Sequence, residues 1–331
     1  MKPTGKSLQV RGAGPGVPAV RPSIALALGG GGARGLAHIL MLEVFDELGL
    51  KPKMIAGTSI GAIFGAAYAS GLSARLIRAH VEEMLSQRFD ILRQLLSARS
   101  EPVLKIFNFL PIRSALLKPE TLLDLMFPSK VARDFADLAI PLKVVATDYY
   151  AQEQVVLSSG PLRTAVAASI ALPALFTPVT VEGRVLMDGG LVNPLPFDTL
   201  VGEADITVAI DVSGASVVLG KHPNPTAFAA LMSSSQILQR SIVREKLKAQ
   251  QPDVYVDVEV DEFYVLDFHR FKQVLAAAAP AKAQLRRQLL KVLASHTAET
   301  LPIAPPVETA AHPPRKKRLP SLKRLSRTRK T

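Results

Sequence analysis

Four consecutive glycines, Gly29 to Gly32, follow a short apolar run at Ile24–Leu28 and precede an amphipathic stretch at Leu36–Leu48. A continuous apolar run of this length is typical of a strand buried on both faces of a sheet. Apolar residues recurring at a helical period indicate a helix that packs on one side. The segment therefore predicts a strand, a glycine loop and a helix in direct succession, which is the building unit of α/β folds.

The same alternation of apolar runs and helical patterns continues along the chain, and no internal repeat interrupts it. Further buried strands are expected at Met54–Ala56, Leu142–Thr147, Val155–Leu157 and Ile206–Val212, and long helices at Thr226–Gln250 and Phe271–Leu293. Strands interleaved with helices favour a mostly parallel sheet that is covered on both faces. We therefore predict an α/β fold with a central, mostly parallel sheet and helices on both of its faces.

The positive charge of the chain is concentrated at its two ends. Of 40 Lys and Arg residues, four lie in residues 1–21 and nine in residues 313–331, and neither segment contains an acidic residue. The remaining chain holds one more acidic than basic residue, whereas a nucleic-acid-binding domain is expected to carry its own basic face. Nucleic-acid binding is therefore not expected as the main role of the folded part.

Composition and spacing exclude several kinds of site. The chain has no cysteine, which excludes disulfides, thiolate metal sites and a cysteine nucleophile. The six histidines include no pair spaced to share a metal, so we expect neither a metal nor a cofactor. The uncharged stretches Met54–Ala74 and Thr164–Val181 are long enough to consider as membrane spans, but their small residues and prolines favour buried parts of a folded domain.

The first candidate for chemistry is Gly57-Thr58-Ser59-Ile60-Gly61, which has the G-x-S-x-G pattern of a nucleophile elbow. An apolar strand is expected before it and a helix of small residues after it. The sharp turn needs Gly57 and Gly61, because a Cβ at either position would meet neighbouring backbone, and it presents the Ser59 hydroxyl above the sheet. The alternative is a glycine and serine turn without chemistry.

The second candidate is the loop Gly29-Gly30-Gly31-Gly32-Ala33-Arg34-Gly35. It lacks the Gly-Lys-Ser/Thr of a phosphate-binding P-loop, and no acidic residue follows at the distance typical of a dinucleotide site. The remaining functional interpretation is an oxyanion hole formed by Gly30, Gly31 and Gly32, with Arg34 anchoring the loop or adding positive potential. A purely structural glycine turn is the alternative.

The third candidate is Asp188, in the segment Met187-Asp188-Gly189-Gly190. An Asp-Gly pair alone indicates no more than a turn. Asp148 and Asp211 each follow a predicted strand and are rival carboxylates.

Taken together, these segments resemble the patatin-like phospholipase family, in particular its short bacterial members. The resemblance covers residues 24–212 and rests on the order and spacing of the glycine loop, the serine motif, Ser169-Ile170-Ala171-Leu172-Pro173, Phe176-Thr177-Pro178-Val179 and Asp188-Gly189-Gly190. It implies a patatin-like three-layer sandwich. The division it suggests is a flexible leader at 1–22, a catalytic domain at 23–212, a helical extension packed on that domain at 213–299, and a proline-rich linker with a basic disordered tail at 300–331.

The resemblance implies a serine lipid acyl hydrolase of phospholipase or esterase type that needs no metal. Ser59 corresponds to the nucleophile, Asp188 to the general base of a Ser–Asp dyad, and the glycine loop to the oxyanion hole. The implied reaction passes through an acyl-enzyme on Ser59. An ordinary aspartate is a weak base, so burial beside Ser59 would have to raise the proton affinity of Asp188.

Two alternatives stay open. One is an α/β-hydrolase triad of Ser59, Asp188 or Asp211, and a later histidine, of which His269 suits the role better than His222 or His296. His38 and His80 lie in helical patterns and are interpreted as surface or core residues. The other alternative is a non-catalytic lipid-binding regulatory module.

Two regions bear on where such a protein acts. Residues 103–127 form either an interfacial lid or an ordinary packed helix pair. The tail at 313–331 has its basic residues in two groups, which favours either peripheral contact with an anionic membrane or a solvated end. The leader lacks the apolar core of a signal peptide, so we expect a cytoplasmic protein, with the inner membrane face as a site of peripheral contact.

Overall fold

The structure is a computed structural model, and it describes residues 21–87, 117–214 and 227–300. The strands of this part are β1 (Ile24–Leu28), β2 (Met54–Thr58), β3 (Leu142–Asp148), β4 (Gln154–Leu157), β5 (Val179–Val181), β6 (Arg184–Asp188), β7 (Ile206–Asp211) and β8 (Val254–Asp257). Its α-helices are α1 (His38–Glu47), α2 (Ile60–Ala69), α3 (Ala74–Gln87), α6 (Pro119–Met126), α7 (Leu162–Ser169), α8 (Ala227–Ala249) and α9 (Phe271–Thr300). Short 3₁₀ turns are η1 (Gly32–Ala37), η3 (Phe135–Asp137), η4 (Gly189–Leu191), η5 (Pro196–Leu200) and η6 (Phe268–Arg270).

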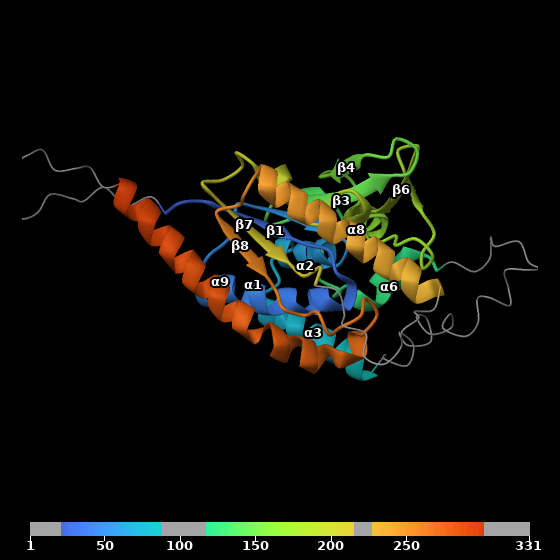
Figure 1. Cartoon of the computed structure of the whole chain (residues 1–331), viewed down its shortest axis with the longest axis horizontal. Helices are drawn as coiled ribbons and strands as arrows, with labels where there is room; N and C mark the ends of the chain where they lie inside the picture. Colours follow the sequence, from blue (N-terminus) through green and yellow to red (C-terminus); the bar gives the residue numbers. More distant parts are fainter. Residues whose placement is uncertain (1–20, 88–116, 215–226, 301–331) are drawn as a thin grey trace, which may run out of the picture.

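The strands form one eight-stranded sheet in the order β5-β6-β3-β2-β1-β7-β8, with β4 paired to β3 (Figure 1). Strands β3, β2, β1, β7 and β8 are parallel, while β4, β5 and β6 form an antiparallel margin. The prediction of a mostly parallel sheet between helical layers is confirmed. The site residues expected after β1 and β2 thus lie at one edge of the sheet, where the carboxyl ends of parallel strands meet.

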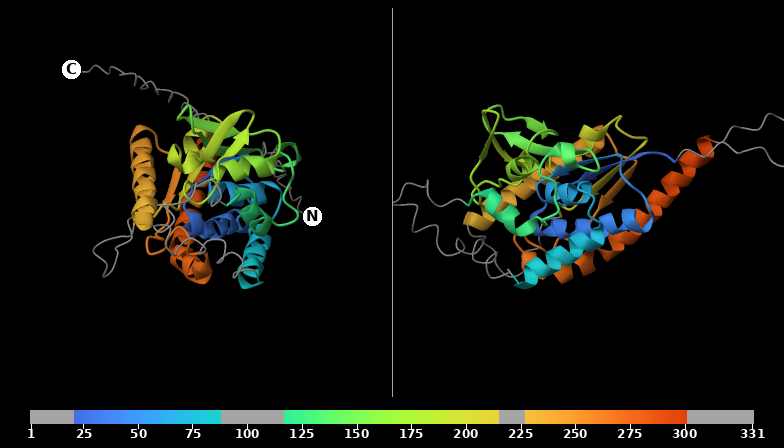
Figure 2. Two further views of the ribbon diagram at one scale, coloured as in Figure 1. Left: turned by 90° about the vertical axis from the view of Figure 1, so that its right-hand side faces the viewer. Right: turned by 180° about the vertical axis from the view of Figure 1, so that it is seen from behind.

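The two faces of the sheet differ in the size of their side chains. On β1, Ile24, Leu26 and Leu28 belong to the larger core cluster, while Ala25 and Ala27 belong to a separate, smaller one. Strand side chains alternate between faces, so each strand divides its residues in this way. Helices α1, α2, α3 and α9 contribute to the larger cluster, and α8 and η5 to the smaller one. In the left view of Figure 2, α8 lies at the side of the molecule away from the other long helices.

The strong sequence patterns correspond to elements close to their expected bounds. Strand β1 matches its prediction, and α8 and α9 begin within one residue of theirs. The short elements β5, β8 and α7 were not predicted, because a run of three to eight mixed residues carries little periodic signal, and the 14-residue helix α3 was not predicted either. The division of the chain into domains stays a prediction; residues 213–299 contribute β8 to the sheet as well as two helices.

The two uncharged stretches considered as membrane spans fall on buried elements. Met54–Ala74 covers β2 and α2, and every residue of α2 is buried. Within the three described ranges, no helix is long and apolar enough to cross a membrane. The leader, the basic tail, residues 103–116 and His222 lie outside the described residues.

Candidate active site

Ser59 occupies a strained turn between β2 and α2. Its backbone angles are φ 53° and ψ −122°, a region that residues with a side chain rarely adopt. A Cβ at Gly57 would lie 2.7 Å from Ala62 Cα, and one at Gly61 would lie 2.1 Å from the Leu28 carbonyl oxygen. Only glycine permits these approaches, so the local sequence accounts for the turn that exposes the Ser59 side chain to the pocket.

The Ser59 hydroxyl donates a hydrogen bond directly to Asp188. Its Oγ lies 2.7 Å from Asp188 Oδ2. Asp188 ends β6 and is 3% exposed. The amide of Gly190 donates to the other carboxylate oxygen, Oδ1, at 2.7 Å, which orients the group toward the serine. The structure thus brings together two residues 129 positions apart, with no side chain between them.

Burial changes the acidity of Asp188. Removal from water penalises the charged carboxylate and raises the pKa of Asp188 to about 6, although the hydrogen bonds from Gly190 and Ser59 act in the opposite direction. A carboxylate with this pKa binds a proton more readily than an ordinary aspartate but is still mostly ionised at neutral pH. It can therefore accept a proton from the neighbouring hydroxyl and return it.

The side chains of Ser169 and Thr147 form hydrogen bonds with the backbone of Ser59 and Asp188. Ser169, at the end of α7, accepts a hydrogen bond from the Ser59 amide at 2.8 Å, and its own hydroxyl donates to the Val145 carbonyl at 2.6 Å. Thr147 Oγ1 donates to the Asp188 carbonyl at 2.8 Å. Sequence analysis placed Ser169 in a family segment but assigned it no role, because nothing local indicates which backbone a buried serine contacts.

The glycine loop lies beside Ser59, but its amides are not equivalent. Gly30 donates its amide to the Pro194 carbonyl at 2.9 Å. The amides of Gly31 and Gly32 donate to no carbonyl of the described residues. A single N–H serves one strong acceptor, so within the predicted oxyanion loop the amides of Gly31 and Gly32 are better placed to receive an oxyanion than that of Gly30.

Arg34 is the buried anchor of this loop. Its side chain is 1% exposed, and Nε donates to the Gly31 carbonyl at 3.2 Å. Burial lowers the pKa of Arg34 to about 10, opposed by the carboxylates of Asp211 and Asp261, so the guanidinium stays charged at neutral pH. By holding the Gly31 carbonyl, Arg34 fixes the orientation of the adjoining peptide groups. Two roles were predicted for Arg34, and the hydrogen bond to the Gly31 carbonyl supports the anchoring of the loop.

The rival carboxylates have other partners. Asp148 Oδ1 accepts from the amides of Tyr150 and Ala151 in a turn. Asp211 accepts from the Ser213 amide and the Tyr255 hydroxyl. Both are buried at strand ends, where they satisfy loop backbone and a tyrosine.

The described histidines do not line the pocket around Ser59. His38 is buried below the glycine loop with Nε2 2.8 Å from the Gly29 carbonyl, and burial lowers the pKa of His38 to about 4. A carbonyl only accepts, so Nε2 carries the proton and the ring is neutral. His269, the base of the alternative triad, is exposed on η6.

The pocket at the dyad is lined mainly by apolar side chains. It is bounded by the glycine loop on one side and by the middle of α8 on the other, through Ser235, Gln236 and Gln239. Its apolar lining consists of Ile60, Ile63, Leu122, Met126, Ile170, Leu172, Leu175, Phe176, Val265, Leu266 and Phe268. Such a lining suits a hydrocarbon chain rather than a polar ligand. Leu122 and Met126 belong to the segment expected to form either a lid or packed helices.

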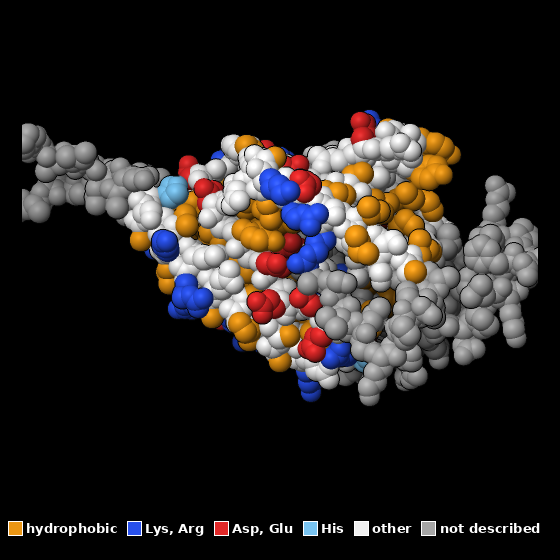
Figure 3. Space-filling view, in the orientation of Figure 1, with side chains coloured by type: hydrophobic (Ala, Val, Ile, Leu, Met, Phe, Trp, Pro, Cys, Tyr) orange, Lys and Arg blue, Asp and Glu red, His pale blue; other side chains and the backbone are white. Residues whose placement is uncertain are grey.

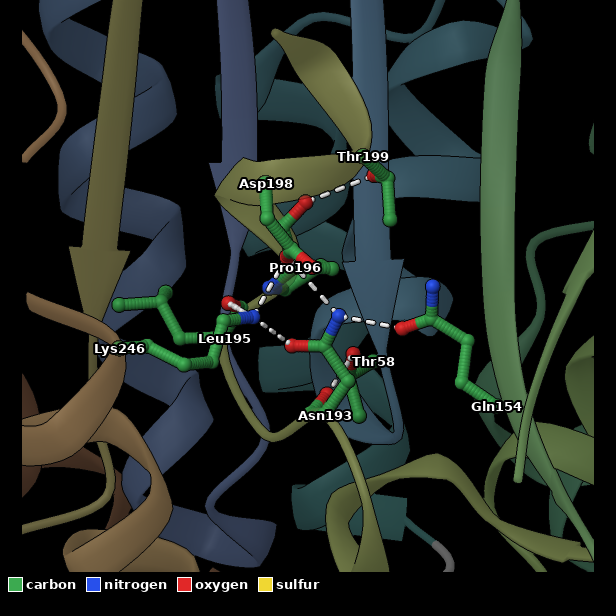
Figure 4. A network of polar contacts seen from close by, with 8 residues as sticks. All are labelled: Thr58, Gln154, Asn193, Leu195, Pro196, Asp198, Thr199 and Lys246. Carbon is green, nitrogen blue, oxygen red and sulfur yellow. Dashed lines mark hydrogen bonds and ion pairs between the residues drawn. The ribbon is translucent and has the colours of Figure 1, made fainter. Parts of the chain in front are cut away.

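A polar network connects α8 to the backbone next to Ser59 (Figure 4). Lys246 Nζ donates to Asn193 Oδ1 at 2.5 Å, to Asp198 Oδ1 at 2.5 Å and to the Leu195 carbonyl at 3.0 Å. The Asn193 carbonyl accepts from Thr58 Oγ1 at 2.8 Å. The network fixes the loop that follows Asp188 against the strand that ends beside Ser59. Sequence analysis did not identify Lys246, since a lysine in a basic stretch carries no signal of its own.

The described residues contain no group of three or more histidine, aspartate or glutamate side chains placed to hold a metal ion.

Comparison with known proteins identifies similar sequences. The family model described as patatin-like phospholipase matches residues 26–201. An uncharacterized NTE family protein of Mycobacterium tuberculosis is 37% identical over 228 residues, which is 68% of this chain and 58% of that protein. Patatin-like phospholipase domain-containing protein 6 of Homo sapiens is 31% identical over 276 residues, 76% of this chain and 19% of that protein. The chain thus spans little more than half the length of the mycobacterial relatives.

Two solved structures are similar at low sequence identity. Human GIVD cytosolic phospholipase A2 in complex with methyl gamma-linolenyl fluorophosphonate has a TM-score of 0.42 and 12% identity, covering 85% of this chain and 60% of that one. VipD from Legionella pneumophila has a TM-score of 0.41 and 14% identity, covering 81% of this chain and 67% of that one.

Proposed function

The chain belongs to the patatin-like phospholipase family, because the family model covers more than half of its length, and on this premise we propose that it hydrolyses acyl esters of lipids. Ser59 is the proposed nucleophile and Asp188 the proposed general base. The observation that carries the proposal is the hydrogen bond of 2.7 Å from Ser59 Oγ to Asp188 Oδ2. A hydroxyl at hydrogen-bond distance from a buried base is the arrangement that nucleophilic catalysis needs.

The proposed reaction has two steps. In the first, Ser59 Oγ attacks the ester carbonyl carbon while its proton moves to Asp188. The alcohol leaves with that proton and an acyl group remains on Ser59. In the second, Asp188 takes a proton from water as the water oxygen attacks the acyl carbon, and this proton returns to Ser59 when the fatty acid leaves. The elevated pKa of Asp188 supports both proton transfers.

The amides of Gly31 and Gly32 are the proposed donors to the negative oxygen of each tetrahedral intermediate. Both glycines line the pocket with Ser59, and Gly32 has a positive φ of 58°. A Cβ at Gly31 would lie 2.5 Å from the Val212 carbonyl oxygen, and one at Gly32 would lie 2.4 Å from that of Val265. A side chain at either position would displace the loop from the serine.

The first experiment compares single variants on a soluble short-chain p-nitrophenyl ester. Ser59→Ala removes the nucleophile and is expected to abolish hydrolysis, together with labelling by a fluorophosphonate probe. Asp188→Asn is expected to lower kcat by about 10²- to 10⁴-fold, the contribution of a general base. His269→Ala is the matched control and should keep nearly full activity. A loss in His269→Ala with activity retained in Asp188→Asn would establish the triad instead.

The pH profile gives a second test of the base. Only the ionised carboxylate of Asp188 accepts a proton, so kcat/KM for the soluble ester should rise as the pH increases through about 6 and then level off. A profile that stays flat from pH 5 to pH 7, measured where the protein remains folded, would contradict Asp188 as the base. Assays over a panel of phospholipids, lysophospholipids and neutral lipids would define the substrate class.

Complete inactivity of the wild type on every ester, with no fluorophosphonate labelling, would favour the non-catalytic lipid-binding module. The roles proposed for the basic tail and for residues 103–116 concern parts of the chain outside the described residues.

A further inference from the structure

Helix α8 makes mostly polar contacts with the rest of the molecule. Its one fully buried apolar side chain among the described residues is Val243, at 3% exposure. Lys246 points inward and is bound by Asn193, Asp198 and the Leu195 carbonyl. A helix of a globular protein usually turns its apolar stripe toward the core. On α8 the inward face combines the apolar Val243 and half-buried Leu247 near its C-terminal end with the polar Ser235, Gln239 and Lys246.

Three large apolar side chains of α8 face outward. Leu231 is 54% exposed, Ile237 61% and Leu238 64%. Leu231 and Leu238 are seven residues apart and share one side of the helix, and Ile237 lies on the same outer half. Orange apolar side chains gather over the right-hand half of α8 in Figure 3. We call Leu231, Ile237 and Leu238 the outer apolar face of α8.

The turns of α8 that carry this face also line the pocket with other side chains. Ser235, Gln236 and Gln239 of the same turns line the pocket that contains Ser59 and Asp188. A Cβ at Gly190 would lie 3.0 Å from Gln239 Nε2, so this part of α8 also packs against the turn that follows Asp188. A surface that contacts the outer apolar face would therefore lie beside the helix that lines one side of the pocket.

Basic residues continue the same exposed side toward the C-terminal end of α8. Arg240, Arg244 and Lys248 are exposed there, and Glu245 is the one acidic residue of the helix. Glu245 pairs with Lys248 at 2.9 Å and with Arg244 at 3.6 Å. Arg240 lies near the carboxylates of Asp211 and Asp257, which leaves Arg244 and Lys248 as the basic residues that share a single acidic partner on the helix. An apolar patch bordered by cations is complementary to a surface that exposes hydrocarbon below anionic headgroups.

We propose that α8 is the helix by which this protein docks on an anionic lipid surface. Leu231, Ile237 and Leu238 enter the boundary between headgroups and acyl chains, while Arg244 and Lys248 contact the headgroups. This docking rests on the proposed lipid hydrolysis, since it places the pocket over its substrate. It is separate from any contribution of the basic tail, because it depends on a helix of the folded part.

The chain has no tryptophan, so a single introduced tryptophan reports on its own position. Leu238→Trp is the probe, and Leu290→Trp is the matched control at a 48% exposed leucine of α9. Both are made in the full chain carrying Ser59→Ala, which prevents hydrolysis of the vesicles. The two proteins are mixed with vesicles of phosphatidylcholine and phosphatidylglycerol, and with vesicles of phosphatidylcholine alone.

Docking predicts a blue-shifted emission and at least a twofold loss of iodide quenching for the tryptophan at position 238 on anionic vesicles. The tryptophan at position 290 should keep its solvent-exposed emission. The proposal is overturned if the protein sediments with the vesicles while both tryptophans stay exposed, since the tail alone would then make the contact. A concentration-dependent blue shift at position 238 without vesicles, and none on adding them, would assign the face to a second protein copy and overturn it too.

A double variant that introduces negative charge on the outer apolar face distinguishes docking from catalysis. Ile237→Glu with Leu238→Glu should weaken binding to anionic vesicles at least tenfold and slow hydrolysis of vesicle lipid, with hydrolysis of the soluble ester unchanged. Leu290→Glu is the control and should alter neither. Equal vesicle binding by the double variant and the wild type contradicts docking. Absence of soluble-ester hydrolysis in the wild type contradicts the proposed function alone, because the tryptophan emission still reports docking.

Discussion

Helices α8 and α9 cover opposite faces of one sheet with opposite kinds of contact. Helix α9 buries a regular apolar stripe in the larger core cluster, formed by Phe271, Val274, Leu275, Ala278, Ala281, Leu285 and Leu289. Its polar side pairs with α1, where Lys282 contacts Glu43 and Glu47. Helix α8 contributes Val243 to the smaller cluster, packs the half-buried Leu247 against it, and is also held by the hydrogen bonds of Lys246.

Helix α9 mainly stabilises the fold, whereas α8 borders the pocket. The two sides of the sheet differ in what covers them: η5 packs directly on β1, β2 and β7 and covers Ala25, Ala27, Ala56 and Ala209, whereas α8 reaches this cluster through Val243 and Leu247. Hydrophobic stabilisation scales with buried apolar area, so α9 should contribute more to stability than α8. Helix α8 is correspondingly free to present apolar side chains to another surface.

The largest effect is expected at the core side of α9. Leu285 is fully buried, and Leu285→Ala should lower the free energy of unfolding by about 2–5 kcal/mol through lost apolar contact and the cavity left behind. Urea denaturation followed by circular dichroism measures it. Leu290→Ala on the exposed side of α9 is the control. A cost below about 1 kcal/mol for Leu285→Ala would remove the contrast between the two helices.

The hydrogen bonds that Lys246 of α8 makes should contribute less to the free energy of unfolding than Leu285 does. Lys246→Met removes one donor from Asn193, Asp198 and the Leu195 carbonyl, and we expect a loss of about 1–3 kcal/mol because hydrogen bonds to a charged group are broken. Lys248→Met is the control, since Lys248 is exposed and pairs only with Glu245 among the described residues. Equal stability of the two variants would mean that Lys246 does not hold α8 in place.

The contribution of the buried Val243 of α8 to the free energy of unfolding should be smaller again. Val243→Ala should cost about 1.5 kcal/mol, from two buried carbon groups at about 0.8 kcal/mol each. The same denaturation experiment applies, with Val201→Ala at a 54% exposed valine as the control. A cost as large as that of Leu285→Ala would show that the smaller cluster is as important to stability as the larger one.

The smallest effect is expected on the outer apolar face. Leu238→Ser should change the free energy of unfolding by less than about 0.5 kcal/mol, because a 64% exposed leucine gains little from folding. A calorimetric melting curve in the absence of lipid measures this. A destabilisation above 1 kcal/mol would indicate that Leu238 packs within the protein, and the contrast between the faces of α8 would fail.

Local sequence determined the parts of the site that depend on neighbouring residues. The apolar run before Gly29, the glycines around Ser59 and the small residues of α2 specify a strand, a sharp turn and a helix, because backbone sterics act over a few positions. The order of these segments along the chain also identified the family and pointed to Asp188.

The tertiary structure decided what those residues contact. Asp188 acquires its raised pKa by burial, Gly30 gives its amide to Pro194, and Ser169 supports the Ser59 backbone. Each of these partners lies far away in sequence, and no periodic pattern encodes which distant groups meet. Helix α8 illustrates the same limit: its pattern predicted a helix, but which of its faces meets protein depends on the loop after Asp188 and on η5, which come to lie beside it only in the folded chain.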